Sequence, residues 1–567
     1  MGMTEAAAAR GVAVRWRRPN GWVLGTLLIG ALVAVPIVSV AVLAFVPEGD
    51  LWWHLVTTVL PGYVFNTLLL AFCVGMGTLV LGTGTAWLVT MCRFPGRRMF
   101  QWALLLPLAF PSYILAYTYT DLLDYAGPVQ ASLRALFGWQ SMQDYWFPPV
   151  RTLSGAAVFM ALVLYPYVYL LARAAFLEQS AGVLEASRSL GHGPWRTFFG
   201  VSLPMARPGI SVGVSLAVME TLNDFGTVDF FAVPTFSVGI YRTWLGMGNA
   251  PAAAQLALLL LVFVILVLWW ERAARRGQRY HQHDSPLEPL AGARLHGWRA
   301  GVATLACALP VVLGFLVPGA VLVEYALGTS VEALGGRFLG IAANTLLVAV
   351  LAALVCVAAA LFMCYGVRLG RRRSLRTGAR LVSAGYAVPG AVLALGVIIP
   401  LAGLDNQVDA LMRAWFGVST GLILSGTVLA LVYAYSVRFL ALPFGTLEAA
   451  LGKITRSMDH AAQSLGKGPG ETLARIHLPM LRGSMLTAGV LVFVDAMKEL
   501  PMTLVLRPFN FETLATHVYQ FASDELLEQA APAAIGIVLT GLLPVLLLSR
   551  AITRTRADAV ELPGGLP

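Results

Sequence analysis

Apolar runs of about 20 residues recur along the whole chain and are separated by short polar segments. A run of this length can cross the hydrocarbon core of a bilayer as an α-helix. The pattern therefore predicts an all-α polytopic membrane protein with about twelve transmembrane helices in two six-helix halves. The expected spans are 22–46, 63–91, 101–120, 152–175, 209–232 and 251–270, followed by 301–323, 341–366, 380–403, 418–440, 483–506 and 532–550.

The two sets of six spans are joined by an arginine-rich segment, 271–299, which is expected to be a cytoplasmic linker. The sequence thus divides into a first membrane half, a linker, a second membrane half and a polar tail. A polar stretch interrupts each half and has the same spacing of glycine and Leu-Pro in both copies. Such self-similarity indicates a duplicated unit. The divisions are 1–270 with its polar stretch at 184–208, 271–299, 300–550 with its polar stretch at 459–484, and 551–567.

Composition and charge placement support the membrane assignment. Hydrophobic residues make up 58% of the chain and charged residues 12%, whereas soluble domains average about 25% charged residues. Arginines cluster at 10–18, 93–98, 272–279 and 368–380, and alternate connections carry Glu48, Asp50, Asp121, Asp124, Asp405 and Asp409 instead. By the positive-inside rule, the amino terminus and the arginine-rich loops are expected to be cytoplasmic. The net charge of +10 therefore indicates topology, and no nucleic-acid partner is predicted.

The repeat extends into the spans. The second span of each half contains Asn-Thr-Leu-Leu, at 66–69 and at 344–347. Two similar halves in parallel order imply a pseudo-two-fold axis along the membrane normal, with a pathway between the halves.

Four acids follow the polar stretches at matching positions: Glu220 and Asp224 in the first half, Asp495 and Glu499 in the second. Their i, i+4 spacing predicts one helix face in each half. Acids at membrane depth usually face a cavity or a partner, and carboxylate oxygens suit hard cations. One interpretation is that the four acids line a translocation pathway. The other is that Lys498 pairs with a neighbouring acid and the rest stabilise the ends of the spans. Tyr113, Tyr117 and Tyr119 could add oxygen donors or belong to an interfacial aromatic belt.

The polar stretches carry a recognisable motif. The first contains Glu185, Ala186, Gly191, Leu203 and Pro204, and the second contains Asp459, His460, Ala461, Ala462, Gly466, Leu478 and Pro479. Each is expected to form a helix that ends at the glycine, a second helical turn, and a Leu-Pro that closes the loop before the next span. The pattern resembles the EAA loop of ABC-importer permeases, which docks in a cleft of the ATPase subunit. In the second copy His460 stands where glutamate is expected, so the charge contact there is expected to differ.

Three longer phrases, at 112–130, 220–235 and 495–515, resemble the fused ferric-iron importer permeases. The resemblance implies a type I ABC importer-like fold in which one chain supplies both halves. It also implies two copies of a cytoplasmic ATPase, a periplasmic protein that delivers iron(III), and a bacterial inner membrane with both termini in the cytoplasm. Relatives that import thiamine, phosphonates or polyamines share this architecture, so those substrates stay open.

The chain lacks the signals of an enzyme. There is no Gly-rich phosphate loop ending in Gly-Lys-Ser/Thr, so ATP and magnesium are expected on the partner ATPase and no cofactor on this chain. No catalytic constellation appears, and five cysteines without a CxxC pair predict buried thiols and no tightly bound metal. A secondary transporter would not need two EAA loops, and a membrane enzyme should show a reactive cluster.

Overall fold

A computed structural model describes residues 21–46, 49–177, 179, 187, 189–275, 293–328, 335–370, 375, 378, 379, 382 and 385–560. Within these residues, ten helices are long and apolar enough to cross a membrane, or up to twelve if each of two bent helix pairs is one span. The all-α polytopic fold predicted from the apolar runs is confirmed. The arginines at 10–18 and most of the linker, residues 276–292, lie outside the described residues.

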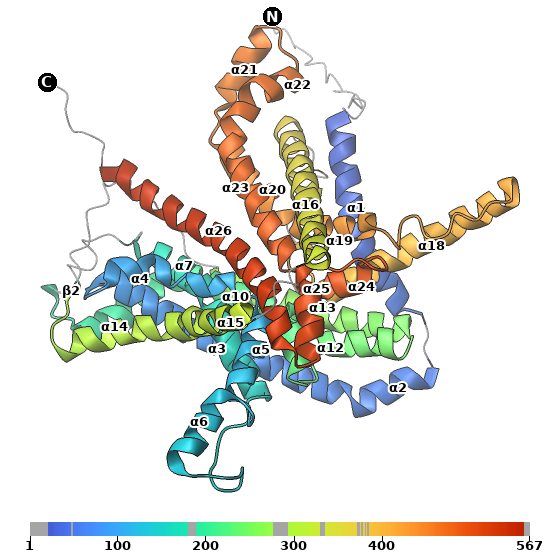
Figure 1. Ribbon diagram of the computed structural model, residues 1–567. Helices are drawn as coiled ribbons and strands as arrows, with labels where there is room; N and C mark the ends of the chain where they lie inside the picture. The colour runs from blue at the N-terminus through green and yellow to red at the C-terminus, as the bar shows by residue number, and fades with distance from the viewer. Residues whose placement is uncertain are drawn as a thin grey trace, which may run out of the picture.

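Most of the described residues of the first half lie in helices (Figure 1). Its helices are α1 (Gly21–Ala44), α2 (Gly49–Thr58), α3 (Leu60–Met91), α4 (Arg97–Ala103), η1 (Leu106–Ala109), α5 (Ser112–Leu123), α6 (Pro128–Phe137), α7 (Leu153–Leu177), α9 (Pro194–Thr197), η2 (Phe198–Ser202), α10 (Leu203–Asn223), α11 (Gly226–Phe230), α12 (Phe236–Tyr241), η3 (Arg242–Gly246) and α13 (Ala250–Arg275).

The second half repeats this order. Its helices are α14 (Trp298–Val311), η4 (Val312–Leu316), α15 (Val317–Gly328), α16 (Gly336–Leu369), α18 (Gly390–Phe416), α19 (Val428–Phe439), α20 (Ala441–Gly452), α21 (Arg456–Ser464), α22 (Pro469–Thr472), η6 (Leu473–His477), α23 (Leu478–Met497), α24 (Pro501–Leu506), α25 (Leu514–Ser523) and α26 (Leu527–Val560). A short parallel pair, β1 (Cys92–Arg93) with β2 (Ala293–Arg294), ties the end of α3 to the residues before α14.

The helices form two bundles that meet near the middle of the molecule (Figure 1). In one bundle α3, α7 and α10 pack together, and in the other α16, α20 and α23 do so. The first helix of each half crosses over: α1 packs against α16 and α18, whereas α14 packs beside α3 and α4. The first helix of each sequence half therefore packs against helices of the other half. These contacts join the two halves.

Two expected spans are bent. The segment predicted at 101–120 is split into Arg97–Ala109 and Ser112–Phe137, which meet at 90°. Pro107 and Pro111 lie at this corner, where a proline interrupts the helical hydrogen bonds and restricts the residue before it. The segment predicted at 418–440 becomes Val428–Phe439 and Ala441–Gly452, bent by 48°.

The prediction that each Leu-Pro pair closes a loop before the next span is wrong. Leu203 and Pro204 do not close a loop, because Trp195–Asn223 is one helix that contains them. In the second half, Leu478 and Pro479 lie inside Pro469–Met497. Each pair directly follows a π-helical turn, η2 or η6. A wider turn alters the hydrogen-bond register, so the missing N–H of the proline is accommodated without ending the helix.

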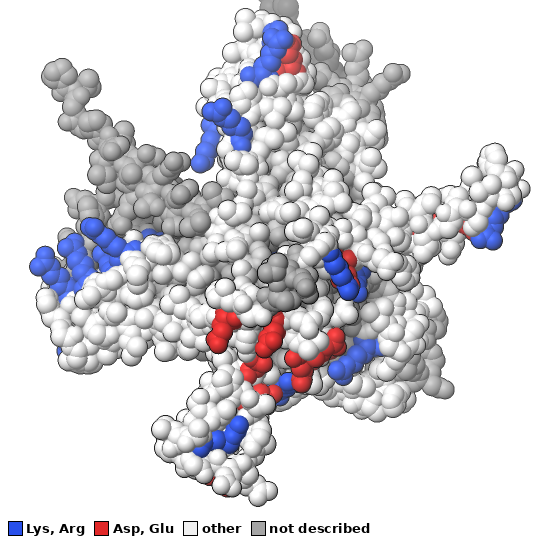
Figure 2. Space-filling view, in the orientation of Figure 1, with Lys and Arg blue, Asp and Glu red and all other residues white. Residues whose placement is uncertain are grey.

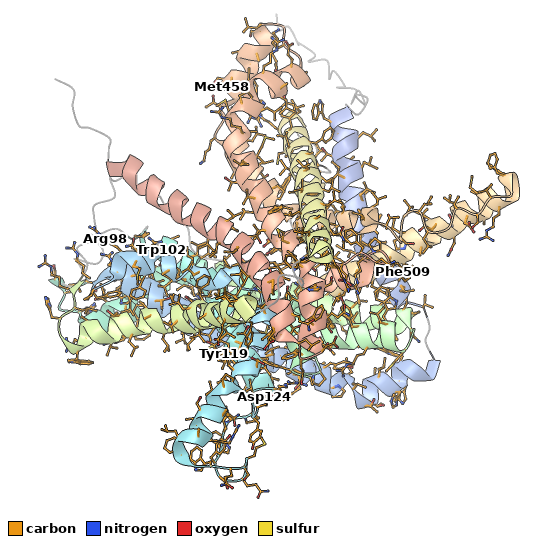
Figure 3. The ribbon with its side chains drawn as sticks, in the orientation of Figure 1. Arg98, Trp102, Tyr119, Asp124, Met458 and Phe509 are labelled. Atoms are coloured by element: carbon orange, nitrogen blue, oxygen red, sulfur yellow. The ribbon has the colours of Figure 1, made fainter. Side chains whose placement is uncertain are left out.

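Charged side chains separate along the molecule (Figure 2). Basic residues gather near α4 and α14, and also near α21 and α22, where an acid lies beside them. Other basic side chains lie at the tip of α18, near α6 and close to the centre, where most of the acids gather. Figure 3 places Arg98 and Trp102 at the outer end of one bundle, and Tyr119 and Asp124 on the opposite side, towards α6. The second polar stretch, which includes α21 and α22, lies at one of these basic regions.

Candidate functional site

The four acids singled out from the repeat lie where α10 and α23 end. Helix α10 stops at Asn223 and helix α23 at Met497. Glu220 and Asp495 are therefore on the last turns of these helices, whereas Asp224 and Glu499 lie beyond them. The expectation that each pair shares one helix face is wrong, because the helix ends between the two acids of each pair.

The two acids beyond the helices hold the short helices that follow. The Asp224 carboxylate accepts the backbone N–H groups of Thr227 at 2.9 Å and Val228 at 3.3 Å, in the first turn of α11. The Glu499 carboxylate accepts the N–H of Met502 at 3.2 Å, in the first turn of α24. These N–H groups have no partner within their helices, so a carboxylate at this point stabilises both the helix and its own charge. The span-end interpretation therefore fits Asp224 and Glu499.

The repeated Asn-Thr pairs support the chain just after these short helices. Asn66 donates its Nδ2–H to the Pro234 carbonyl at 3.1 Å, and the Thr67 hydroxyl accepts the N–H of Phe236 at 3.3 Å. In the second half, Asn344 donates to the Glu512 carbonyl at 3.2 Å, and the Thr345 hydroxyl accepts the N–H of Leu514 at 2.8 Å. The repeated Asn-Thr pairs at 66–67 and 344–345 thus hold the segments after α11 and α24 in place through hydrogen bonds to their backbone.

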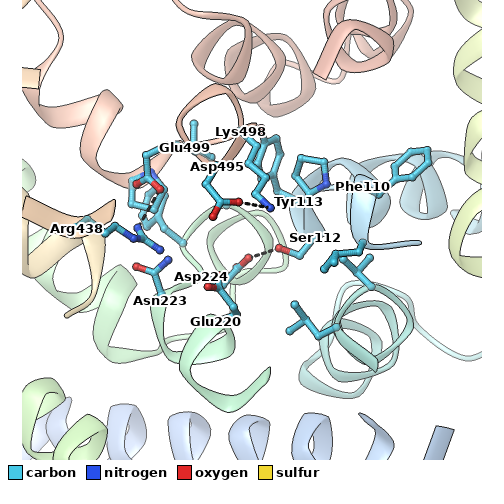
Figure 4. A pocket seen from close by; sticks show the side chains of 18 of the residues that line it. Phe110, Ser112, Tyr113, Glu220, Asn223, Asp224, Arg438, Asp495, Lys498 and Glu499 are labelled. Carbon is cyan, nitrogen blue, oxygen red and sulfur yellow. Dashed lines mark hydrogen bonds and ion pairs between the residues drawn. The ribbon is translucent and has the colours of Figure 1, made fainter. Parts of the chain in front are cut away.

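All four acids line one cavity between the halves (Figure 4). It is partly open to solvent and has a volume of about 90 Å³. Its walls come from η1, α5, α7, α10 and the start of α11 in the first half. In the second half they come from Tyr386, which precedes α18, from α19, and from the end of α23 up to the start of α24. The polar side chains on its wall are Ser112, Tyr113, Tyr167, Glu220, Asn223, Asp224, Tyr386, Arg438, Asp495, Lys498 and Glu499.

The acids of the first half have neutral partners. Glu220 accepts the hydroxyl of Tyr386 at 3.0 Å, a hydrogen bond that crosses between the halves. Asp224 accepts the Ser112 hydroxyl at 2.5 Å and the Thr227 hydroxyl at 2.9 Å, and it is 9% exposed. The Asp224 carboxylate thus accepts hydrogen bonds from several donors. The Glu220 carboxylate accepts one, so it can still bind a cation or a further donor.

The acids of the second half have cationic partners. Lys498 Nζ lies 2.9 Å from Asp495 Oδ1, and this pair is partly exposed, at 27% and 20%. Arg438 Nη1 lies 2.9 Å from Glu499 Oε2, and this pair is nearly sealed, at 4% and 5%. The expectation that Lys498 pairs with a neighbouring acid is confirmed. Sequence reasoning missed Arg438, although a single arginine inside an otherwise apolar span is a signal for a buried partner.

Counting formal charges, four carboxylates against one arginine and one lysine leave the cavity wall with an excess of two negative charges. A carboxylate-lined cavity with a net negative wall attracts cations and repels anions. Among the residues that the structure describes, no group of three or more His, Cys, Asp or Glu side chains is placed to hold a metal ion.

The tyrosines of α5 lie inside the protein. The side chains of Tyr113 and Tyr117 are 4% and 2% exposed, and their hydroxyls have no hydrogen-bond partner among the described residues. The Tyr119 hydroxyl donates to the Leu313 carbonyl at 2.6 Å. These positions exclude an aromatic belt, and only Tyr113 lines the cavity.

The turns of the two polar stretches adopt the predicted conformation. Gly191 has φ +78° and Gly466 has φ +73°, in the left-handed region that favours glycine. The residue before each glycine, Leu190 or Leu465, is exposed at 76% or 78%. Glu185 and Ala186 lie outside the described residues, so their expected contact stays a prediction.

The second polar stretch differs from the simple docking surface that its motif suggests. His460 and Ala461 on α21 are exposed, but the Asp459 carboxylate turns inward. It accepts Arg368 Nε at 2.8 Å and lies 2.9 Å from His477 Nε2. Arg368 also donates to the carbonyls of Leu451 and Ile454. Asp459 therefore links α21 to the end of α16. Its carboxylate already contacts Arg368 and His477, so it is a weak candidate for an ion pair with a partner protein.

Comparison with known proteins identifies the architecture. Residues 78–280 match the model of the family described as binding-protein-dependent transport system inner membrane component. The molybdenum transport system permease protein ModB of Escherichia coli K12 is 30% identical over 190 residues, which cover 32% of this chain and 79% of that protein. The chain belongs to this family.

Two further relatives differ in how much of the chain they cover. The Fe(3+)-transport system permease protein FbpB 2 of Haemophilus influenzae is 27% identical over 496 residues, 86% of this chain and 89% of that protein. The sulfate transport system permease protein CysT of Escherichia coli K12 is 31% identical over 184 residues, 32% of this chain and 62% of that protein.

Family membership assigns the chain its general role. It is the membrane-embedded, multi-pass permease component of a binding-protein-dependent import system. The cavity lies between its two halves, and the second polar stretch, which includes α21 and α22, lies at a basic end of the molecule.

Proposed function

We propose that this chain is the permease of an ATP-driven importer of iron(III), with Glu220 and Asp495 on the translocation pathway. The similarity to the Fe(3+) permease, which extends over both halves, carries the proposal. The molybdenum and sulfate permeases match only about a third of the chain. The cavity wall, with its excess of negative charge, favours a cation over an anion such as sulfate.

The charge of the cavity supports a weak, transient hold on the cargo. Two unit charges 4 Å apart attract by about 4 kcal/mol at the effective dielectric constant near a protein surface. A trivalent ion among four bare carboxylates would be bound too tightly to leave. Arg438 and Lys498 neutralise two of these acids, which fits a pathway that attracts iron and still releases it.

The partners follow from the same proposal. Two copies of a cytoplasmic ATPase would dock on the polar stretches at 184–208 and 459–484, and a periplasmic protein would deliver iron to the opposite side. The basic bundle ends would then face the cytoplasm of a bacterial inner membrane, with both termini on that side. ATP and magnesium would bind the ATPase, and this chain would carry no catalytic group or cofactor.

Transport by the reconstituted system tests the proposal. The permease is placed in liposomes with its ATPase and its binding protein, and uptake of radioactive iron(III), molybdate, sulfate, thiamine and a phosphonate is measured. ATP-dependent uptake of iron alone is expected, and a hydrolysis-deficient ATPase is the control. ATP-dependent uptake of another compound, with no uptake of iron, would replace iron as the cargo.

A further inference from the structure

Two cations line the cavity, but only one of them can move easily. Arg438 and Glu499 are almost fully buried, and Glu499 also accepts the N–H of Met502. That pair is fixed within the packed protein. Lys498 and Asp495 form an ion pair of similar length, but 27% and 20% of their side chains are exposed to the cavity. The lysine side chain has a flexible four-carbon stem that ends in a compact charge. Its ammonium group can therefore move away from Asp495 and return to it.

The first half has no such cation. Asn223 occupies the position that matches Lys498, and its side-chain oxygen accepts the N–H of Gly390 at 2.6 Å. Glu220, which matches Asp495, accepts a hydrogen bond from a neutral tyrosine hydroxyl. The cavity therefore presents one acid with a neutral donor and one acid with a movable cation. This asymmetry is unexpected in a repeat that otherwise keeps its acids in register.

The surroundings of Lys498 connect the two acids. Its electrostatic neighbours are Asp495, Tyr167 and Glu220, and Tyr167 in turn lies near both acids. The Lys498 ammonium thus lies in the field of the open acids of both halves. Asp224 and Glu499, by contrast, are saturated by the helix starts and their side-chain partners.

We propose that Lys498 is a tethered counter-ion, which a metal cation displaces from Asp495 during transit and which then returns to expel the metal. This inference rests on the proposed function and names the residue that keeps the site weak. No covalent bond of the protein changes: the ion pair between Lys498 and Asp495 breaks as the metal is coordinated by the Asp495 carboxylate, and it re-forms when the metal leaves. Lys498 therefore limits how long the cargo stays.

Metal retention by the full-length permease in lipid nanodiscs tests the inference. Gallium(III), a redox-inert trivalent ion supplied as its citrate complex, is the probe, and bound gallium is measured after equilibrium dialysis. Lys498→Met keeps the apolar stem and removes the charge. We expect it to bind gallium more tightly by on the order of tenfold or more, because one repelling charge is removed from the site. Lys498→Arg is the matched control and should bind as weakly as the wild type.

A double variant separates this role from a purely structural one. Lys498→Met combined with Asp495→Asn removes the acid as well, so gallium retention should fall back to the wild-type level or below. A structural ion pair predicts that Lys498→Met lowers the yield of folded protein and leaves retention unchanged. Equal retention in wild type and Lys498→Met would overturn the inference, even if iron uptake by the wild type upholds the proposed function. Absence of iron uptake in the wild type would count against the function itself.

Discussion

The buried pair of Arg438 and Glu499 gives the sharpest energetic prediction. Glu499→Gln keeps the oxygen that accepts the Met502 N–H but removes the charge that faces Arg438. Both side chains are at most 5% exposed, so the arginine is left with an uncompensated charge in the protein interior. Breaking a buried pair from one side costs about 3–5 kcal/mol. The same change at Asp495 should cost no more than about 1 kcal/mol, because Lys498 stays partly in contact with water.

Thermal unfolding in detergent, followed with a thiol-reactive dye, measures this difference. Four of the five cysteines are buried, namely Cys92, Cys307, Cys356 and Cys364, so the dye reports loss of the fold. Glu499→Gln should lower the midpoint by about 3–4 °C, whereas Asp495→Asn should lower it by no more than about 1 °C.

The double variant Arg438→Met with Glu499→Gln removes both charges and should recover most of the loss. An unchanged midpoint in Glu499→Gln, or equal losses in Glu499→Gln and Asp495→Asn, would refute the view that the two pairs differ in burial and role.

Three further predictions concern coupling and the cavity wall. Gly191→Pro and Gly466→Pro should insert normally but uncouple ATP hydrolysis from transport, since proline cannot adopt a positive φ; wild-type transport in both would contradict the coupling role. Glu185→Ala should reduce copurified ATPase more than His460→Ala, because a carboxylate is the stronger acceptor for a partner arginine or lysine; equal losses would argue against it. Gly390→Ala should lower the melting temperature, because a Cβ there would lie 2.9 Å from Arg438 Nη1; an unchanged melting temperature would show that the pair adapts.

The sequence predicted much of this architecture because hydropathy, charge placement and the internal repeat report directly on membrane spans. It placed the acids of both halves in register, and these acids do line one cavity. It did not predict that α10 and α23 end between the paired acids. Local periodicity continues through that point, and only the carboxylates that accept N–H groups from α11 and α24 show the break.

Other features depend on contacts far apart in the sequence. The partner of Glu499 is Arg438, which comes from a different span. Asp459 is taken by Arg368 and His477, which the motif alone could not indicate. The Leu-Pro pairs lie inside helices because π turns precede them, and no propensity rule for proline anticipates that.

We infer that Glu220 and Asp495, which are open to the cavity, carry the cargo, whereas Asp224 and Glu499, whose oxygens are occupied by donors, hold the fold. Glu220 and Asp224 allow the most direct test, because both belong to the first half and neither has a cationic partner. The measurement is the iron(III) uptake rate per folded permease for Glu220→Gln and Asp224→Asn, with folded yield recorded alongside. We expect slow uptake at normal yield for Glu220→Gln, and reduced yield with normal uptake per folded molecule for Asp224→Asn. Normal uptake and normal yield in both variants would contradict it.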